Sequence, residues 1–318
     1  MTAASAPLDA RVPGRTSTSL WRDTLGHILR QRSARFGLTL IGIIVAGAAL
    51  AGILTPYGPT EQLGSVEGSQ RLGGPCIHLL GCPSSQPQFV MGLDENTRDV
   101  FSRVLHGGRV SLTVGLVTVG IAIVVGTLIG SIAGYAGGWV DNILMRFMDV
   151  LLAFPALVLV IFLATTFDSF DLPIFENRLF NAMFAIGIVA IPVYARVMRA
   201  SVLSIREREF VLAARALGES GGGILLRRIL PNALTPLIVQ GTLGIATAIL
   251  EVAALSFIGL GAVPPTAEWG SMIGNVRNQV FAAPHLVIFP GLALSMSVLA
   301  FNLLGDGIRD ALDPRLNR

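Results

Sequence analysis

The sequence predicts an all-α membrane protein with six transmembrane helices. The chain of 318 residues is 52% hydrophobic and only 14% charged, and its mean hydropathy is +0.68. An ordinary soluble domain carries about 25% charged residues. Six apolar stretches each approach the ~20 residues that a helix needs to cross a bilayer. Because backbone groups in hydrocarbon must find partners within their own segment, such long continuous stretches indicate helices rather than strands.

The six predicted spans cover residues 36–54, 110–136, 143–167, 181–198, 235–262 and 285–304. Three glycines at four-residue spacing in the second span, Gly126, Gly130 and Gly134, favour close packing against a neighbouring helix. Ahead of the first span, polar residues 1–19 predict a disordered cytoplasmic N-terminus. Residues 20–35 predict an amphipathic helix, which lies either in the membrane interface or against other protein.

The basic residues predict how the chain is oriented in the membrane. All 23 of them are arginines, and positive charge is retained on the cytoplasmic side. Arginines gather before the first span, between the fourth and fifth spans and in the C-terminal tail, whereas the loop 55–108 contains only Arg71, Arg98 and Arg103. We therefore expect both termini to be cytoplasmic in a multi-pass protein of the cell membrane. This topology, rather than nucleic-acid binding, explains the net charge of +3.

The predicted outer loop contains the only two cysteines of the chain, Cys76 and Cys82. An oxidising compartment outside the membrane favours a disulfide between them, and two free thiols are the alternative. A metal site built from these cysteines and His78 would have an incomplete ligand set. No metal site is predicted.

Several chemistries lack the residues that they require. The chain has no lysine, which excludes a Walker A phosphate loop and Schiff-base catalysis. Its four histidines do not have the spacing of a metalloprotease, and no Gly-x-Ser-x-Gly elbow is present. The sequence therefore predicts a non-catalytic membrane protein, and transport is the remaining expectation.

Three ionisable residues fall in or near the predicted hydrocarbon region. Arg146 and Asp149, three residues apart, are expected to pair on one helix face. Glu251 is near the middle of the fifth span, where a charge is costly and usually faces a partner or water. A proton-coupled transporter would use such a carboxylate. A glutamate that is hydrogen-bonded to a neighbouring helix is the favoured interpretation.

The segment 204–231, between the fourth and fifth spans, predicts a helix–turn–helix. Residues 206–217 are good helix formers, Gly218 stops or turns the chain, and a second short helix is expected from about residue 224 to Pro231. Small side chains in this segment allow close contact. Such a projection suits insertion into a groove on a soluble partner.

This segment resembles the shared loop of the permease subunits of ABC importers. That loop reads Glu-Ala-Ala, three residues, Gly, nine residues, Ile, one residue and Leu-Pro. Aligned on Gly218, residues 213–220 read Ala-Ala-Arg-Ala-Leu-Gly-Glu-Ser. This resembles the sequence motif of the dipeptide and oligopeptide branch. The resemblance assigns six residues to the loop that couples to an ATPase: Glu209, Ala213, Ala214, Arg215, Gly218 and Pro231.

Further matches extend the resemblance from Arg30 to Arg318, and they resemble the C-type permease subunit. They are the segments 91–103, 251–270 and 301–315. Leu93 and Thr97 stand where the family has threonine and glycine. Glu251 belongs to a string shared by the family, which favours a packing role over proton coupling.

The resemblance implies the type I ABC importer permease fold for residues 36–318, with an extracytoplasmic loop at 55–108 and a coupling loop at 204–231. Besides the lipid bilayer, it implies four protein partners: a related permease in a heterodimer, two ABC ATPase subunits below the membrane and an extracytoplasmic solute-binding protein above it. ATP and Mg²⁺ would be bound by the ATPases, so no cofactor is expected in this chain. The implied function is import of di- or oligopeptides by alternating access, and a proton-coupled secondary transporter using Glu251 is the alternative.

Overall fold

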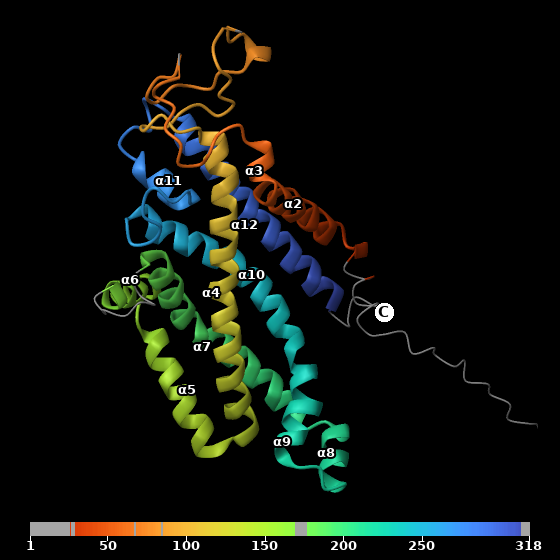
Figure 1. Ribbon diagram of the computed structural model, residues 1–318. Helices are drawn as coiled ribbons and strands as arrows, with labels where there is room; N and C mark the ends of the chain where they lie inside the picture. Colours follow the sequence, from red (N-terminus) through yellow and green to blue (C-terminus); the bar gives the residue numbers. More distant parts are fainter. Residues whose placement is uncertain (1–25, 27–28, 67, 84, 169–176, 313–318) are drawn as a thin grey trace, which may run out of the picture.

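The computed structural model describes residues 26, 29–66, 68–83, 85–168 and 177–312 (Figure 1). Within these ranges the regular elements are helices, and the only β-type pairings are two isolated bridges, Cys76 with Phe89 and Leu93 with Asp99. Five helices are long and apolar enough to cross a membrane: α2 (Arg32–Ala49), α4 (Val100–Ala136), α7 (Arg178–Arg206), α10 (Leu230–Phe257, with the turns before it) and α12 (His285–Leu312). The predicted all-α class is confirmed.

A bent pair of helices brings the number of candidate spans to six when its two halves are counted as one span. The pair is α5 (Gly138–Ala153) and α6 (Ala156–Asp168), and its axes differ by 95°. The prediction of one continuous helix over 143–167 is therefore wrong. At the break, Phe154 is extended, with φ −82° and ψ 143°, because a following proline disfavours the helical conformation.

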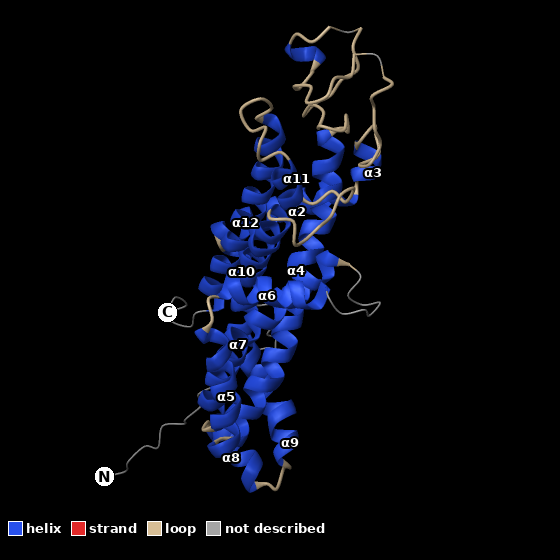
Figure 2. Ribbon diagram, turned by 90° about the vertical axis from the view of Figure 1, so that its left-hand side faces the viewer, coloured by secondary structure: helices blue, strands red, loops and turns tan. Residues whose placement is uncertain are grey.

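The long helices are arranged as a bundle with one crossing member. In Figure 1, α2, α7, α10 and α12 run roughly parallel, and α4 crosses them. Helix α12 packs against both α2 and α10, and α4 packs along α7 and α10. Figure 2 shows an elongated molecule with the long loop 55–99 at one end and α8 (Glu209–Ala216) and α9 (Gly221–Gly223) at the other.

The glycines of α4 bring α7 into close contact, as their spacing predicts. A Cβ at Gly126 would lie 2.6 Å from the Cβ of Tyr194, and one at Gly130 would overlap the carbonyl oxygen of Ala195. A Cβ at Gly134 would lie 2.9 Å from the Arg199 carbonyl oxygen. The interface between α4 and α7 therefore depends on the absence of side chains at these positions.

The remaining short elements are α3 (Ala51–Leu54), η1 (His78–Leu80), the π-helical η3 (Ile224–Ile229) and α11 (Trp269–Asn275). Trp269 of α11 is buried against α4 and donates from its indole nitrogen to the carbonyl of Val104 at 2.9 Å. The predicted disordered segment 1–19 lies outside the described residues. So does half of the predicted helix 20–35, and its residues 32–35 form the first turn of α2.

Candidate functional site

A knob of three short helices joins α7 to α10. The knob comprises residues 207–229, with α8, α9 and η3, and lies at the opposite end of the molecule from the long loop (Figures 1 and 2). Val211, Ile224 and Ile229 hold its parts together and are at most 1% exposed. The helix–turn–helix expected from the sequence is present, but its second helix does not end at Pro231. Pro231 lies in the first turn of α10, where the missing N–H of proline is tolerated.

Gly218 makes the turn that separates α8 from α9. Its φ is +79°, a left-handed conformation that favours glycine. The turn is closed by two backbone bonds, from Gly218 N to the Arg215 oxygen at 3.0 Å and from Glu219 N to the Ala214 oxygen at 3.1 Å. Glu219 also pairs with Arg228 across the knob at 3.1 Å. The two halves of the knob are therefore fixed relative to each other.

The outward surface of the knob combines apolar and charged side chains. Leu217 is 88% exposed and Leu226 is 63% exposed. Among the six residues assigned to the coupling loop, Ala214 is buried and five are exposed: Glu209, Ala213, Arg215, Gly218 and Pro231. A surface of this kind, with exposed leucines beside charges, is typical of a protein interface.

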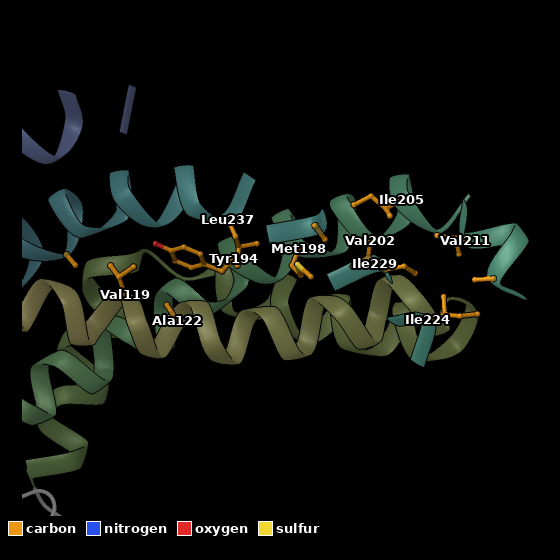
Figure 3. Packing of buried hydrophobic residues seen from close by; sticks show 13 residues of the cluster. Val119, Ala122, Tyr194, Met198, Val202, Ile205, Val211, Ile224, Ile229 and Leu237 are labelled. Atoms are coloured by element: carbon orange, nitrogen blue, oxygen red, sulfur yellow. The ribbon is translucent and has the colours of Figure 1, made fainter. Parts of the chain in front are cut away.

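A continuous cluster of buried side chains connects the knob with the middle of α7. We call it the linking cluster, and Figure 3 shows it extending from Val119 and Tyr194 to Val211 and Ile224. Met198, Val202 and Ile205 of α7 lie between the two ends, each at most 6% exposed. Its members are Val119, Ala122, Tyr194, Met198, Val202, Ile205, Val211, Ala214, Ile224, Ile229, Ala233, Leu237 and Ala248.

A cavity of about 360 Å³ lies at the far end of the linking cluster. It is bounded by α4, α7, α10 and the break between α5 and α6, and it shares Val119, Tyr194 and Ala248 with the linking cluster. Apolar side chains from the helix break and from α7 form one wall. The polar side chains that line the cavity come from three helices: Thr118, Tyr194, Gln240, Thr247 and Glu251.

Two polar groups of the cavity, those of Thr118 and Glu251, have no hydrogen-bond partner within the described part of the chain, whereas the Thr247 hydroxyl donates to the Leu243 carbonyl at 3.5 Å. The Thr118 hydroxyl is buried without a hydrogen bond. For Glu251 the structure shows neither a hydrogen bond to the described residues nor an arginine among them within 4.0 Å. The expectation that Glu251 is hydrogen-bonded to a neighbouring helix is therefore wrong. Its half-buried carboxyl faces open space instead.

The other two intramembrane charges do not form the predicted pair. Asp149 is bound by Arg196 of α7 at 2.5 Å, and no carboxylate of the described residues lies within 4.0 Å of Arg146. A second, less exposed pair joins the same helices, because both Arg199 Nε and Nη2 donate to Asp141 at 2.5 Å. Two ion pairs thus connect α5 to α7, and the i, i+3 spacing on one helix is not used.

The long loop is held by a disulfide and a buried ion pair. Cys76 and Cys82 are bonded, with their Cα atoms 5.4 Å apart. Asp94 binds Arg98 at 2.7 Å, next to Thr97, whose φ is +57°. Burial raises the pKa of Asp99, which caps α4 by accepting from the Ser102 amide at 2.8 Å. The described residues contain no group of three or more potential metal ligands.

The knob can be predicted from the sequence, whereas the cavity cannot. Gly218 and the alanines before it mark the turn directly. The cavity depends on residues from three helices whose packing the sequence does not specify. One signal was available on α10, because Gln240, Gly244, Thr247 and Glu251 are spaced by four, three and four residues and therefore share a helix face.

Comparisons with known proteins identify the family. Residues 126–318 match the model for the binding-protein-dependent transport system inner membrane component, and residues 19–67 match that for the N-terminal TM domain of oligopeptide transport permease C. The chain is similar to the dipeptide transport system permease protein DppC of Alkalihalophilus pseudofirmus, with 41% identity over 95% of this chain and 92% of that protein.

Two further relatives have comparable similarity. The di/tripeptide transport system permease protein DppC of Pseudomonas aeruginosa is 40% identical over 90% of this chain and 89% of its own length. The glutathione transport system permease protein GsiD of Pectobacterium atrosepticum is 38% identical over 93% of this chain and 91% of its own. The chain therefore belongs to the family of inner-membrane components of binding-protein-dependent transport systems and is a multi-pass membrane protein.

Proposed function

We propose that this chain is the non-catalytic permease subunit of an ABC importer for di- or oligopeptides. Relatives named for dipeptides, di- and tripeptides and glutathione support this class of solute. The chain would form the path across the membrane together with a related permease. Two ATPase subunits would bind ATP and Mg²⁺, and an extracytoplasmic binding protein would deliver the solute.

The linking cluster is the observation that carries this proposal. It joins an exposed knob to a cavity in the middle of the membrane helices through side chains that are close-packed and nearly inaccessible. Packed interiors transmit displacements because they deform little. Movement of the knob by an ATPase would therefore move α7 and the cavity wall with it, which is the requirement for alternating access.

The same arrangement supports an orientation. The knob carries Arg208, Arg215, Arg227 and Arg228 and would lie in the cytoplasm with both termini, by the excess of arginine there. The disulfide-bonded long loop would lie on the opposite side, in an oxidising compartment.

Substitutions at Gly218 test the coupling role of the knob. A Cβ at Gly218 would have nothing within 4 Å in this chain, so added bulk there can clash only with a partner protein, while any side chain at this positive φ also carries backbone strain. Asn tolerates positive φ, which makes Gly218→Asn a small change, whereas Gly218→Trp adds bulk at the surface. We expect Gly218→Trp to abolish peptide uptake and co-purification of the ATPases, and Gly218→Asn to retain much of both.

The experiment compares both variants with the parent chain, co-produced with the second permease, the ATPases and the binding protein. Equal uptake by all three would contradict the coupling role. If the purified chain alone moved peptide down a proton gradient, the proton-coupled alternative would hold instead. Family membership gives that alternative no support.

A further inference from the structure

Glu251 is the only charged residue among the described residues that line the cavity. It lies six residues before the end of α10, which places it about 9 Å along the helix from that end at 1.5 Å per residue. A charged side chain at such a depth usually has a partner or faces water. The arginines of α7 are not available, since Arg196 and Arg199 are bound to Asp149 and Asp141.

The residues around Glu251 form a polar stripe on one face of α10. Gln240, Gly244, Thr247 and Glu251 all line the cavity. Gly244 leaves room for the hydroxyl of Tyr194, which a Cβ at that position would overlap. The phenol of Tyr194 therefore reaches from α7 to the stripe, into the same cavity as the Glu251 carboxyl.

Two further observations indicate that the cavity receives a polar solute. Thr118, on the α4 wall, has a fully buried hydroxyl with no hydrogen-bond partner, which is costly and which a solute or water relieves only when the neighbouring side chains move. The volume of about 360 Å³ falls within the ~300–1,000 Å³ of sites for small ligands. Leu151, Phe154 and Val193 provide an apolar wall beside these polar groups.

We propose that the Glu251 carboxylate recognises the free α-ammonium group of a peptide in transit. The proposal rests on the proposed function, and it adds the group that selects the substrate within the membrane path. The ammonium group would supply the positive charge that this carboxylate lacks within the described chain. The Tyr194 hydroxyl would bind the polar backbone of the peptide, and the apolar wall would contact its side chains.

The test is uptake of two solutes that differ only in the amino group. Alanyl-alanine carries the α-ammonium, and propionyl-alanine is the same molecule without it. Uptake of each is measured in proteoliposomes that contain the complete importer and its binding protein, with the parent chain and with Glu251→Gln. The ratio of parent to variant uptake is taken for each solute, so that the selectivity of the unchanged binding protein cancels.

For alanyl-alanine we expect Glu251→Gln to lower uptake about tenfold or more, the effect of losing one charged hydrogen bond. For propionyl-alanine we expect little change. Glu251→Asp, which keeps the charge, should restore part of the preference for the amine. Thr247→Val, a change of similar volume on the same stripe, should affect both solutes equally.

Equal losses for the two solutes with Glu251→Gln would overturn the proposal, and so would failure of this variant to assemble. Either result would mean that Glu251 serves the structure or pairs with another subunit. If the parent importer takes up neither solute when ATP is present, the proposed peptide function fails instead. The two failures are therefore distinguishable.

Discussion

Thr97 is a residue at which the backbone conformation and the side chain disagree. Its φ of +57° is a left-handed conformation that is unfavourable by roughly 1–2 kcal/mol for residues with a Cβ, and more so for a β-branched one. The conformation is held by its neighbours, because Asp94 Oδ1 accepts from the amides of Asn96 and Arg98 at 2.8 and 2.9 Å. The family has a glycine at this place, and the turn forms here without it.

Thr97→Gly should stabilise the protein. Removal of the Cβ relieves the left-handed strain, and the greater freedom of glycine in the unfolded chain offsets part of the gain, which leaves about 0.5–1 kcal/mol. Thermal unfolding in detergent should show a small rise in midpoint. Thr97→Ala, which keeps a Cβ at the same φ, is the matched control and should give no such rise. A lower midpoint for Thr97→Gly would contradict this account of the turn.

At the scale of single elements, the contact between α4 and α7 depends on particular glycines. Gly130→Ala would place a methyl group against the Ala195 carbonyl and 2.8 Å from the Met198 Cβ. Overpacking of this kind costs about 1–3 kcal/mol. We expect a clear fall in the unfolding temperature and loss of assembled importer.

Gly120 provides the control for this substitution on the same helix. A Cβ at Gly120 would have nothing within 4 Å, so Gly120→Ala should be neutral or stabilise the helix by up to ~1 kcal/mol. A similar fall for both variants would mean that the helix tolerates no alanine in this region, and that the contact with α7 is not the cause.

The helices show which features the sequence could predict and which it could not. Hydropathy located every long helix, because a length of apolar residues is a local property. It did not find the break after Phe154, although Pro155 marks it. Proline alone is an ambiguous signal, since Pro192, Pro236 and Pro290 lie inside continuous helices. Whether a proline bends the chain depends on the neighbouring helices, and the local sequence does not specify where those helices lie.

The candidate site divides in the same way. Gly218 and its flanking alanines predicted the knob, because a turn is specified by a few adjacent residues. The partners of Asp149 and Glu251 were predicted wrongly, since each depends on what another helix presents. Asp149 pairs with Arg196, which is 47 residues away in the sequence. Glu251 lines the cavity.

At the scale of the whole molecule, the linking cluster makes the knob and the cavity parts of one mechanical unit. Met198 is 0% exposed and lies between its two ends. Met198→Ala would leave a void there and cost about 2–5 kcal/mol of stability. We expect the importer to hydrolyse more ATP for each peptide taken up, because displacement of the knob would be partly absorbed by the void.

Met272→Ala separates this effect from general destabilisation. Met272 is also buried, at 7% exposed, but it belongs to a different cluster beside α11. Its truncation should lower stability without changing the number of ATP molecules hydrolysed per peptide, measured in the same proteoliposomes. An equal rise in ATP hydrolysed per peptide for both variants would show that the linking cluster has no specific role in coupling.

The 95° break between α5 and α6 has a consequence for hydration. A continuous helix satisfies its own backbone, whereas a break leaves the last carbonyls of one helix and the first amides of the next without intrahelical partners. Lipid supplies no hydrogen bonds, so such backbone is tolerated at membrane depth only where it is buried in protein or lines a water-filled space. The break borders the cavity through Leu152, Phe154 and Ala156, and we therefore expect ordered water to enter the membrane at this point even when no solute is bound.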